Sequence, residues 1–138
     1  MQSFKIFWKI LFSLAVIASL SFLSGCDAGS NDPVATAVST GNGYKMQLAA
    51  SLTSVRVGGT STLTAVVFEP DGSPIRDGEE VFFAAERGKF SDDSVKTSGG
   101  TAVVTFTAGE NPLNLETVTA TCHGAISSLQ IIIVPEKF

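Results

Sequence analysis

The chain contains two cysteines and one histidine, and two of these three residues are adjacent, Cys122 and His123. A cysteine nucleophile needs a base within hydrogen-bonding reach, but adjacent side chains of a β-strand point to opposite faces. Residues 117–122 alternate between threonine and small apolar side chains as a strand does, so His123 is not expected to activate Cys122. We expect Cys122 to be a small buried side chain and His123 to be solvated at the strand end.

Carboxylates in predicted loops are the best candidates for a cation site. Asp71, Asp77 and Glu79 flank one connection, and Asp92 and Asp93 lie in a later loop. Oxygen-rich loops can bind calcium. The chain has no Asp-x-Asp-x-Asp-Gly series, however, and aspartate is common in turns because its side chain bonds to the local backbone. No metal site and no cofactor are therefore predicted, and calcium stays an alternative.

The other cysteine, Cys26, ends the run Leu23-Ser24-Gly25-Cys26. This run resembles the lipobox of bacterial lipoproteins, in which leucine and two small residues precede an obligatory cysteine. The resemblance implies that a lipid is attached to the Cys26 thiol and that the chain is cut before this residue. A membrane is thus an expected partner, through the lipid on Cys26.

Residues 1–25 have the organisation of an export signal. Lys5 and Lys9 precede a fourteen-residue run, 10–23, whose only polar residues are serines. A spanning helix needs about 20 apolar residues, so a cleaved signal is favoured and an uncleaved anchor is the alternative. We expect the rest of the chain on the outer face of a membrane of the bacterial envelope, either the periplasmic side of the inner membrane or the outer membrane. Asp27 resembles an enterobacterial inner-membrane retention signal.

Acidic residues dominate after Cys26. Because Lys5 and Lys9 precede it, seven of the nine basic residues and all thirteen acidic residues remain, a net charge of −6. Such a surface repels phosphate backbones, and no basic stripe is present, so no nucleic-acid partner is predicted. The chain also lacks a Gly-x-Ser-x-Gly elbow, a phosphate-binding loop and a His-Glu-x-x-His motif, so no catalytic residue and no enzymatic activity are predicted.

Residues 26–43 are rich in glycine and small polar residues and contain no large apolar side chain. Such a segment buries too little surface to offset its ordering entropy, which predicts a flexible tether. The predicted organisation is therefore a lipoprotein signal peptide (1–25), a tether (26–43) and one folded domain (44–138).

The folded domain shows a hydrophobic period of two, which is typical of strands with one buried face. Turn residues such as Gly58-Gly59 and Gly99-Gly100 separate the apolar runs. The predicted strands are 45–50, 54–57, 60–69, 80–86, 92–97, 101–108, 115–123 and 126–134. Seven to eight short strands at this spacing predict an all-β fold, an antiparallel β-sandwich.

Several short runs, in order, resemble the bacterial immunoglobulin-like (Ig-like) domain of the invasin/intimin type. They are Gly59-Thr60-Ser61-Thr62-Leu63-Thr64-Ala65, Asp71-Gly72-Ser73-Pro74-Ile75, Val81-Phe82-Phe83, Gly88-Lys89-Phe90 and Gly100-Thr101-Ala102-Val103-Val104. The resemblance covers about 48–134 and implies an Ig-like β-sandwich that serves as a spacer or an adhesive unit. The tryptophan and tyrosine of antibody-type domains are missing from their places.

Strand parity divides the side chains between the core and the solvent. The inward set is Leu63, Ala65, Val67, Val81, Phe83, Ala85, Ala102, Val104, Phe106, Val118, Ala120, Cys122, Leu129, Ile131 and Ile133. Phe82, Ile132 and Val134 then point outward. The sandwich that the resemblance implies has strands 80–86, 115–123 and 126–134 in one sheet, with 115–123 in the middle. This arrangement predicts an apolar stripe on a normally polar face, a candidate partner surface. The alternatives are a one-residue shift of the last strand and a tether that covers the stripe.

Together these features predict a lipid-anchored Ig-like module of the bacterial cell envelope with a structural, adhesive or protein-binding role. Its expected partners are the membrane and an envelope protein. The alternative is a glycan- or calcium-binding domain that uses the loops at one end of the sandwich.

Overall fold

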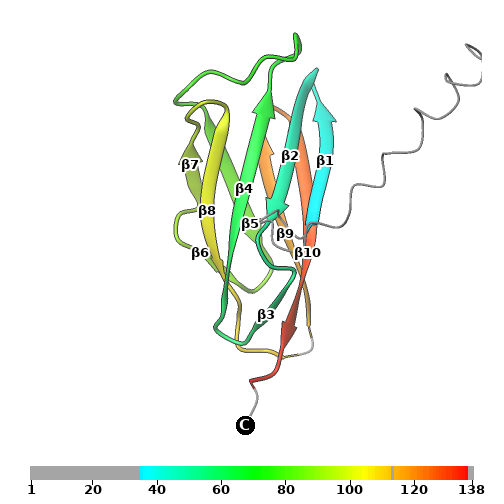
Figure 1. Cartoon of the computed structure of the whole chain (residues 1–138), viewed down its shortest axis with the longest axis vertical. Coiled ribbons are helices and arrows are strands. Elements are labelled where there is room, and N and C mark those ends of the chain that lie inside the picture. Colours follow the sequence, from blue (N-terminus) through cyan, green and yellow to red (C-terminus); the bar gives the residue numbers. More distant parts are fainter. Residues whose placement is uncertain (1–34, 113, 137–138) are drawn as a thin grey trace, which may run out of the picture. The chain divides into compact units, whose positions relative to one another are not determined.

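The computed structural model describes residues 35–112 and 114–136, which form ten strands in two five-stranded sheets (Figure 1). In sheet A the strand order is β1 (Ala35–Gly41), β2 (Tyr44–Ala50), β4 (Thr60–Phe68), β8 (Thr101–Thr107) and β6 (Lys89–Phe90). In sheet B the order is β3 (Ser54–Arg56), β10 (Ala125–Val134), β9 (Leu115–Cys122), β5 (Glu80–Ala85) and β7 (Ser94–Lys96). All pairs are antiparallel except β10 with β3.

The predicted fold class is confirmed, because the described chain is an all-β sandwich. All eight predicted strands are present, and β1 and β6 are additional. Strand β9 lies between β10 and β5, as predicted. No helix that could span a membrane occurs within 35–112 and 114–136. The predicted signal peptide and Cys26 lie outside the described residues.

Strand β1 corrects the predicted tether. Residues 35–41 pair in register with β2, from Ala35 opposite Ala50 to Gly41 opposite Tyr44, so the folded domain begins before residue 44. This strand buries few apolar atoms. Backbone pairing with β2 and a hydrogen bond from the Ser127 hydroxyl to the Ala37 carbonyl (3.1 Å) position it instead. The low hydrophobicity that predicted a tether therefore does not prevent an edge strand.

Two tight hairpin turns meet at one end of the sandwich. Asn42-Gly43 joins β1 to β2 and His123-Gly124 joins β9 to β10, and all four residues have positive φ, as in type I′ turns. The Asn42 side chain donates to the carbonyl of His123 at 3.2 Å. A Cβ at Gly41 would lie 2.0 Å from the carbonyl oxygen of Gly124, so only glycine allows the two hairpins to approach this closely.

The core lies between the sheets and follows the predicted parity. Every residue of the predicted inward set is buried except Ala85, which is half-buried against the core. Phe106 is fully buried, and its ring lies 5.5 Å from that of Phe90, which lies 5.8 Å from that of Phe83. These three aromatic rings connect both sheets, since they come from β8, β6 and β5.

One carboxylate is buried with the apolar residues. Glu116 on β9 is 1% exposed. Its Oε1 accepts the backbone N–H groups of Arg87 (2.6 Å) and Gly88 (3.3 Å), in the loop that leads from β5 to β6. A buried polar group needs such partners to offset its desolvation. Glu116 thus holds this loop against the sandwich.

Candidate binding surfaces

The outer face of sheet B carries a pair of large apolar side chains in one row. Phe82 on β5 and Ile126 on β10 are both paired in register with Thr121 on β9, and they are 54% and 56% exposed. We call Phe82 and Ile126 the Phe82 patch. Polar faces are the norm on the solvent side of an antiparallel sheet, so this pair is a candidate contact for a partner.

The second predicted residue, Ile132, is also exposed, but it lies elsewhere on the same face. It is paired with Leu115, six residues along β9 from Thr121, which corresponds to about 20 Å. Leu52 is close to this pair, since it is the second residue before β3, and its neighbour Thr53 accepts the N–H of Ile132 through its carbonyl at 2.7 Å. We call Leu52, Leu115 and Ile132 the Leu52 patch. The predicted stripe is therefore two separate patches.

Val134, the third residue of the predicted stripe, is half-buried. The short strand β3 pairs beside Val134, with Arg56 in register. The carbonyl of Val134 accepts the N–H of Val57 at 3.0 Å. Sequence reasoning did not include Ile126, Leu115 or Leu52. Ile126 and Leu115 could have been found, since each has the same parity as an outward residue of its own strand. No such signal exists for Leu52, which lies in a loop.

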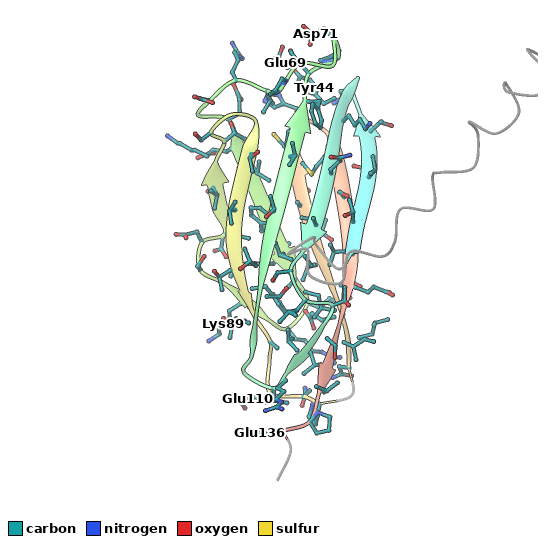
Figure 2. The ribbon with its side chains drawn as sticks, viewed as in Figure 1. Tyr44, Glu69, Asp71, Lys89, Glu110 and Glu136 are labelled. Carbon is teal, nitrogen blue, oxygen red and sulfur yellow. The ribbon has the colours of Figure 1, made fainter. Side chains whose placement is uncertain are left out.

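His123 is not simply a solvated strand-end residue. Its ring stacks on that of Tyr44, with centroids 4.7 Å apart, and its Nε2 lies 2.7 Å from Oε2 of Glu79. Oε1 of Glu79 accepts from the Arg76 guanidinium at 3.1 Å. These contacts join the turn after β9, the start of β2 and the loop before β5 at the end where Figure 2 shows Tyr44, Glu69 and Asp71.

The Glu79 carboxylate makes stability depend on pH. The hydrogen bond from His123, with the charges of His123 and Arg76, lowers its pKa. A carboxyl whose pKa is lower in the folded chain stabilises the fold above its unfolded pKa, and the contribution is lost as pH falls through the folded value. The melting temperature of the wild type should therefore be higher than that of Glu79→Gln at about pH 6, and the two melting temperatures should converge towards about pH 3. A gap that does not narrow would contradict this assignment. Glu110→Gln, at an exposed loop position, is the control.

Cys122 is 2% exposed, which confirms the prediction that it is buried. Burial, and then the negative charge of Glu79, raise the pKa of its thiol. A thiol held in this protonated state is a poor nucleophile. The Nε2 atom of His123 is hydrogen-bonded to Glu79, and His123 does not activate Cys122 in this arrangement.

The carboxylates of the predicted loops make separate local contacts. Asp71 accepts from the backbone N–H of Ser73 at 2.8 Å and also from its hydroxyl, and these bonds lower the pKa of Asp71. Asp77 accepts from the N–H of Gly99 at 2.7 Å. Among the described residues, no three His, Cys, Asp or Glu side chains gather in a group that could hold a metal ion.

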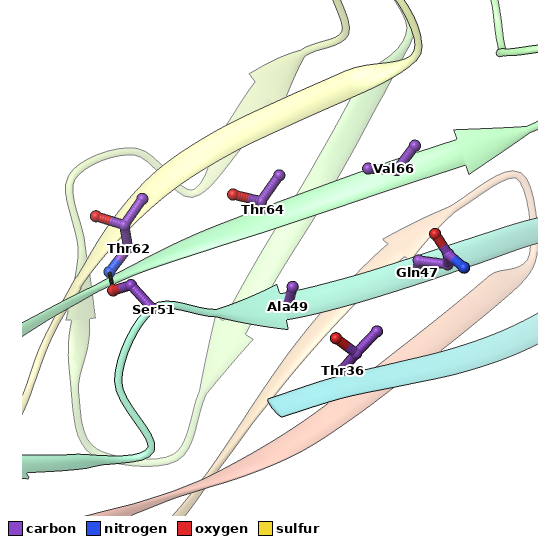
Figure 3. Close-up of a pocket in the computed structure, with 7 residues that line it drawn as sticks. All are labelled: Thr36, Gln47, Ala49, Ser51, Thr62, Thr64 and Val66. Carbon is purple, nitrogen blue, oxygen red and sulfur yellow. Dashed lines mark hydrogen bonds between the residues drawn. The ribbon is translucent and has the colours of Figure 1, made fainter. Parts of the chain in front are cut away.

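The outer face of sheet A bears a shallow hollow of about 320 Å³ (Figure 3). Its lining comes from β1, β2, β4 and the residue after β2, and consists of Thr36, Gln47, Ala49, Ser51, Thr62, Thr64 and Val66. The Ser51 hydroxyl accepts the N–H of Thr62 at 2.9 Å, so its oxygen is already engaged. The hollow presents hydroxyl, amide and methyl groups without charge, which suits an uncharged ligand.

No protein-family model and no curated protein sequence matches this chain. Solved structures of intimin do match in fold. The C-terminal 282-residue fragment of intimin, in complex with the intimin-binding domain of the translocated intimin receptor, has a TM-score of 0.53 and 24% identity over 62% of this chain. The D0-D1 domain of intimin has a TM-score of 0.51 and 21% identity over 71%. The D00-D0 domain has 0.52 and 20% over 77%.

The chain covers 31%, 49% and 51% of these three structures, less than two thirds of each. At these identities the likeness concerns the fold. The chain is thus an Ig-like β-sandwich of the kind found in intimin. The Phe82 patch lies on the outer face of sheet B, and the Leu52 patch consists of two residues of that face and one residue of the loop before β3.

Proposed function

We propose that this chain is a lipid-anchored Ig-like module of the bacterial cell envelope that binds a protein partner through the Phe82 patch. Its role is structural or adhesive rather than enzymatic. The lipobox-like run that ends at Cys26 supports the anchor. The intimin fragment of similar fold was solved in complex with a protein receptor, which supports a protein partner.

The observation that carries the partner proposal is the row Phe82–Thr121–Ile126. Phe82 and Ile126 expose about half of their surface on either side of a half-buried threonine. Ala84 and Ser128, the next outward residues on β5 and β10, are small, so the large side chains protrude. A few large anchors that become fully desolvated, aromatic residues prominent among them, carry most of the affinity of a protein interface.

The anchor is tested by Cys26→Ser. We expect this variant to lose incorporation of labelled palmitate and to move from the detergent phase to the aqueous phase, because the thiol is the proposed attachment point. Cys122→Ser is the matched control and should keep the label, since Cys122 is buried in the core. Wild-type protein that is unlabelled and stays in the aqueous phase would overturn the lipid anchor.

The partner surface is tested by photocrosslinking in cells. A photoreactive phenylalanine analogue at position 121 should give a specific adduct, identified by mass spectrometry, whereas the analogue at Val103, exposed on sheet A, should not. Phe82→Ser with Ile126→Ser should abolish the adduct and leave the melting temperature nearly unchanged, because both side chains are exposed. A fall of roughly 10 °C or more would instead assign these residues to stability. Equal adducts from positions 121 and 103 would contradict the assigned surface.

A further inference from the structure

The Leu52 patch is a second apolar surface with a different position. Leu52, Leu115 and Ile132 are 48%, 52% and 49% exposed. Leu115 and Ile132 are cross-strand neighbours, and the loop that carries Leu52 is bonded to β10 through Thr53. The patch belongs to the part of sheet B towards the end where Figure 2 shows Glu110 and Glu136.

The side chain of Leu52 is held outward by a buried residue. Ser61 is 2% exposed, and its hydroxyl donates to the carbonyl of Leu52 at 2.8 Å and accepts the N–H of Leu52 at 3.1 Å. Both backbone groups of this loop residue are therefore satisfied inside the domain. An apolar side chain that the fold fixes in solvent in this way is pre-organised for contact.

The chain enters the folded domain close to this patch. Ala35, the first residue of β1, is in register with Ala50, two residues before Leu52. Cys26 precedes Ala35 by nine residues, half of the predicted tether. Nine residues span at most roughly 30 Å, so a lipid on Cys26 keeps the domain, including this patch, within that distance of the bilayer surface.

We propose that the Leu52 patch rests on the surface of the bilayer to which Cys26 is attached. This inference depends on the lipid anchor of the proposed function. A short tether creates a high effective concentration of the patch at the membrane, so a contact too weak to bind free protein becomes populated. Aliphatic side chains gain free energy when they enter the boundary between headgroups and acyl chains.

Charge does not favour a different occupant for this patch. Arg56 on β3 is exposed and lies in register with Val134, two residues from Ile132, whereas Glu110 and Glu136 lie towards the same end. This end of the domain therefore carries both signs, and the aliphatic residues of the patch would make the contact with the lipid surface. The Phe82 patch lies about 20 Å away along the sheet and stays open to a protein partner.

Tryptophan fluorescence tests the contact in a form that does not need lipidation by the cell. The only tryptophan, Trp8, precedes Cys26, so residues 26–138 have none, and residues 31–138 form one compact unit. Protein 26–138 is coupled through Cys26 to a maleimide-bearing lipid in phosphatidylcholine vesicles with brominated acyl chains, and Cys122 stays buried. Leu52→Trp and Ile132→Trp report on the Leu52 patch, and Phe82→Trp is the matched control on the same face.

We expect bromine to quench Leu52→Trp and Ile132→Trp at least twofold more strongly than Phe82→Trp. Equal quenching at all three positions, or stronger quenching of Phe82→Trp, would overturn the proposal. Circular dichroism of each variant verifies the fold. If one of the two reporter substitutions, Leu52→Trp or Ile132→Trp, perturbs the fold, the other still tests the contact. Because coupling is chemical, a negative result rejects the bilayer contact alone, whereas failed palmitate labelling of wild type rejects the lipid anchor.

Discussion

Phe106→Ala is expected to destabilise the domain by about 4 kcal/mol and to lower its melting temperature by roughly 20 °C. Phe106 is fully buried in the core, and its ring packs against that of Phe90. The ring also approaches Gly88 so closely that a Cβ added to Gly88 would lie 2.1 Å from the ring. Removing the ring leaves a cavity between the two sheets that rigid strands on both sides cannot fill.

Two further substitutions on the same strand calibrate this result. Phe106→Leu leaves a smaller cavity and should cost less than half as much. Val103→Ala removes a side chain that is 51% exposed on the outer face of sheet A and should change the melting temperature by only a few degrees. Differential scanning calorimetry measures all three variants. A melting temperature for Phe106→Ala near that of Val103→Ala would contradict the assigned core.

Glu116→Leu is expected to cost about 3 kcal/mol, even though leucine is apolar and similar in size. The carboxylate oxygen Oε1 is the acceptor for the N–H groups of both Arg87 and Gly88. Leucine leaves both partly buried donors without this partner, and a donor left unsatisfied away from water costs up to about 1–3 kcal/mol. The loop from β5 to β6 should loosen as a result.

Glu116→Gln is the informative comparison, because it keeps an oxygen acceptor of the same reach. We expect it to retain most of the stability that leucine loses. Amide hydrogen exchange at Arg87 and Gly88 measures the contact directly and should accelerate in Glu116→Leu. Thr117→Ala, one position along β9 with its side chain half-buried on the other face, controls for general effects on the strand. Unchanged exchange in the leucine variant would show that Glu116 does not hold this loop.

The two apolar patches define how the proposed module would work. A short connection to the lipid and the Leu52 patch would stand the domain on the bilayer by the end of sheet B that holds Leu115 and Ile132. The Phe82 patch, about 20 Å along the same face, would then lie away from the bilayer and be open to a partner within the envelope. Area on one outer face would thus be divided between a membrane contact and a protein contact. Each is tested by separate variants above.

Much of the fold could be predicted because it is recorded in local alternation. Residues 101–107 alternate threonine or valine with alanine, valine and phenylalanine, and the structure buries Ala102, Val104 and Phe106. Each strand reveals its inward face in this way, since successive side chains point to opposite sides. The resemblance to invasin/intimin-type domains added the strand order, which placed β9 between β5 and β10.

Alternation of apolar and polar residues does not reveal which segments pair as strands when these segments bury little apolar surface. The sequence 35–41 has no large side chain, yet β2 offers it a complete set of backbone partners, and the Asn42-Gly43 turn brings the two together. Similarly, Lys89 and Phe90 form a strand too short to show a period, and only β8 beside them defines it. Backbone hydrogen bonds carry these pairings, and every residue type but proline can make them.

The sequence by itself determined the class of fold, the inward faces of the strands and the burial of Cys122. The tertiary structure alone decided where side chains from different strands meet. Phe82 and Ile132 point outward by parity, but the distance between them depends on the register of β5 and β10 against β9. This register places Phe82 in one row with Ile126, on either side of Thr121. The same is true of His123, Glu79 and Tyr44, which are far apart in the chain. They meet because the two hairpin turns and the loop before β5 lie at the same end of the sandwich. Register is a property of pairs of strands, and no single strand contains it.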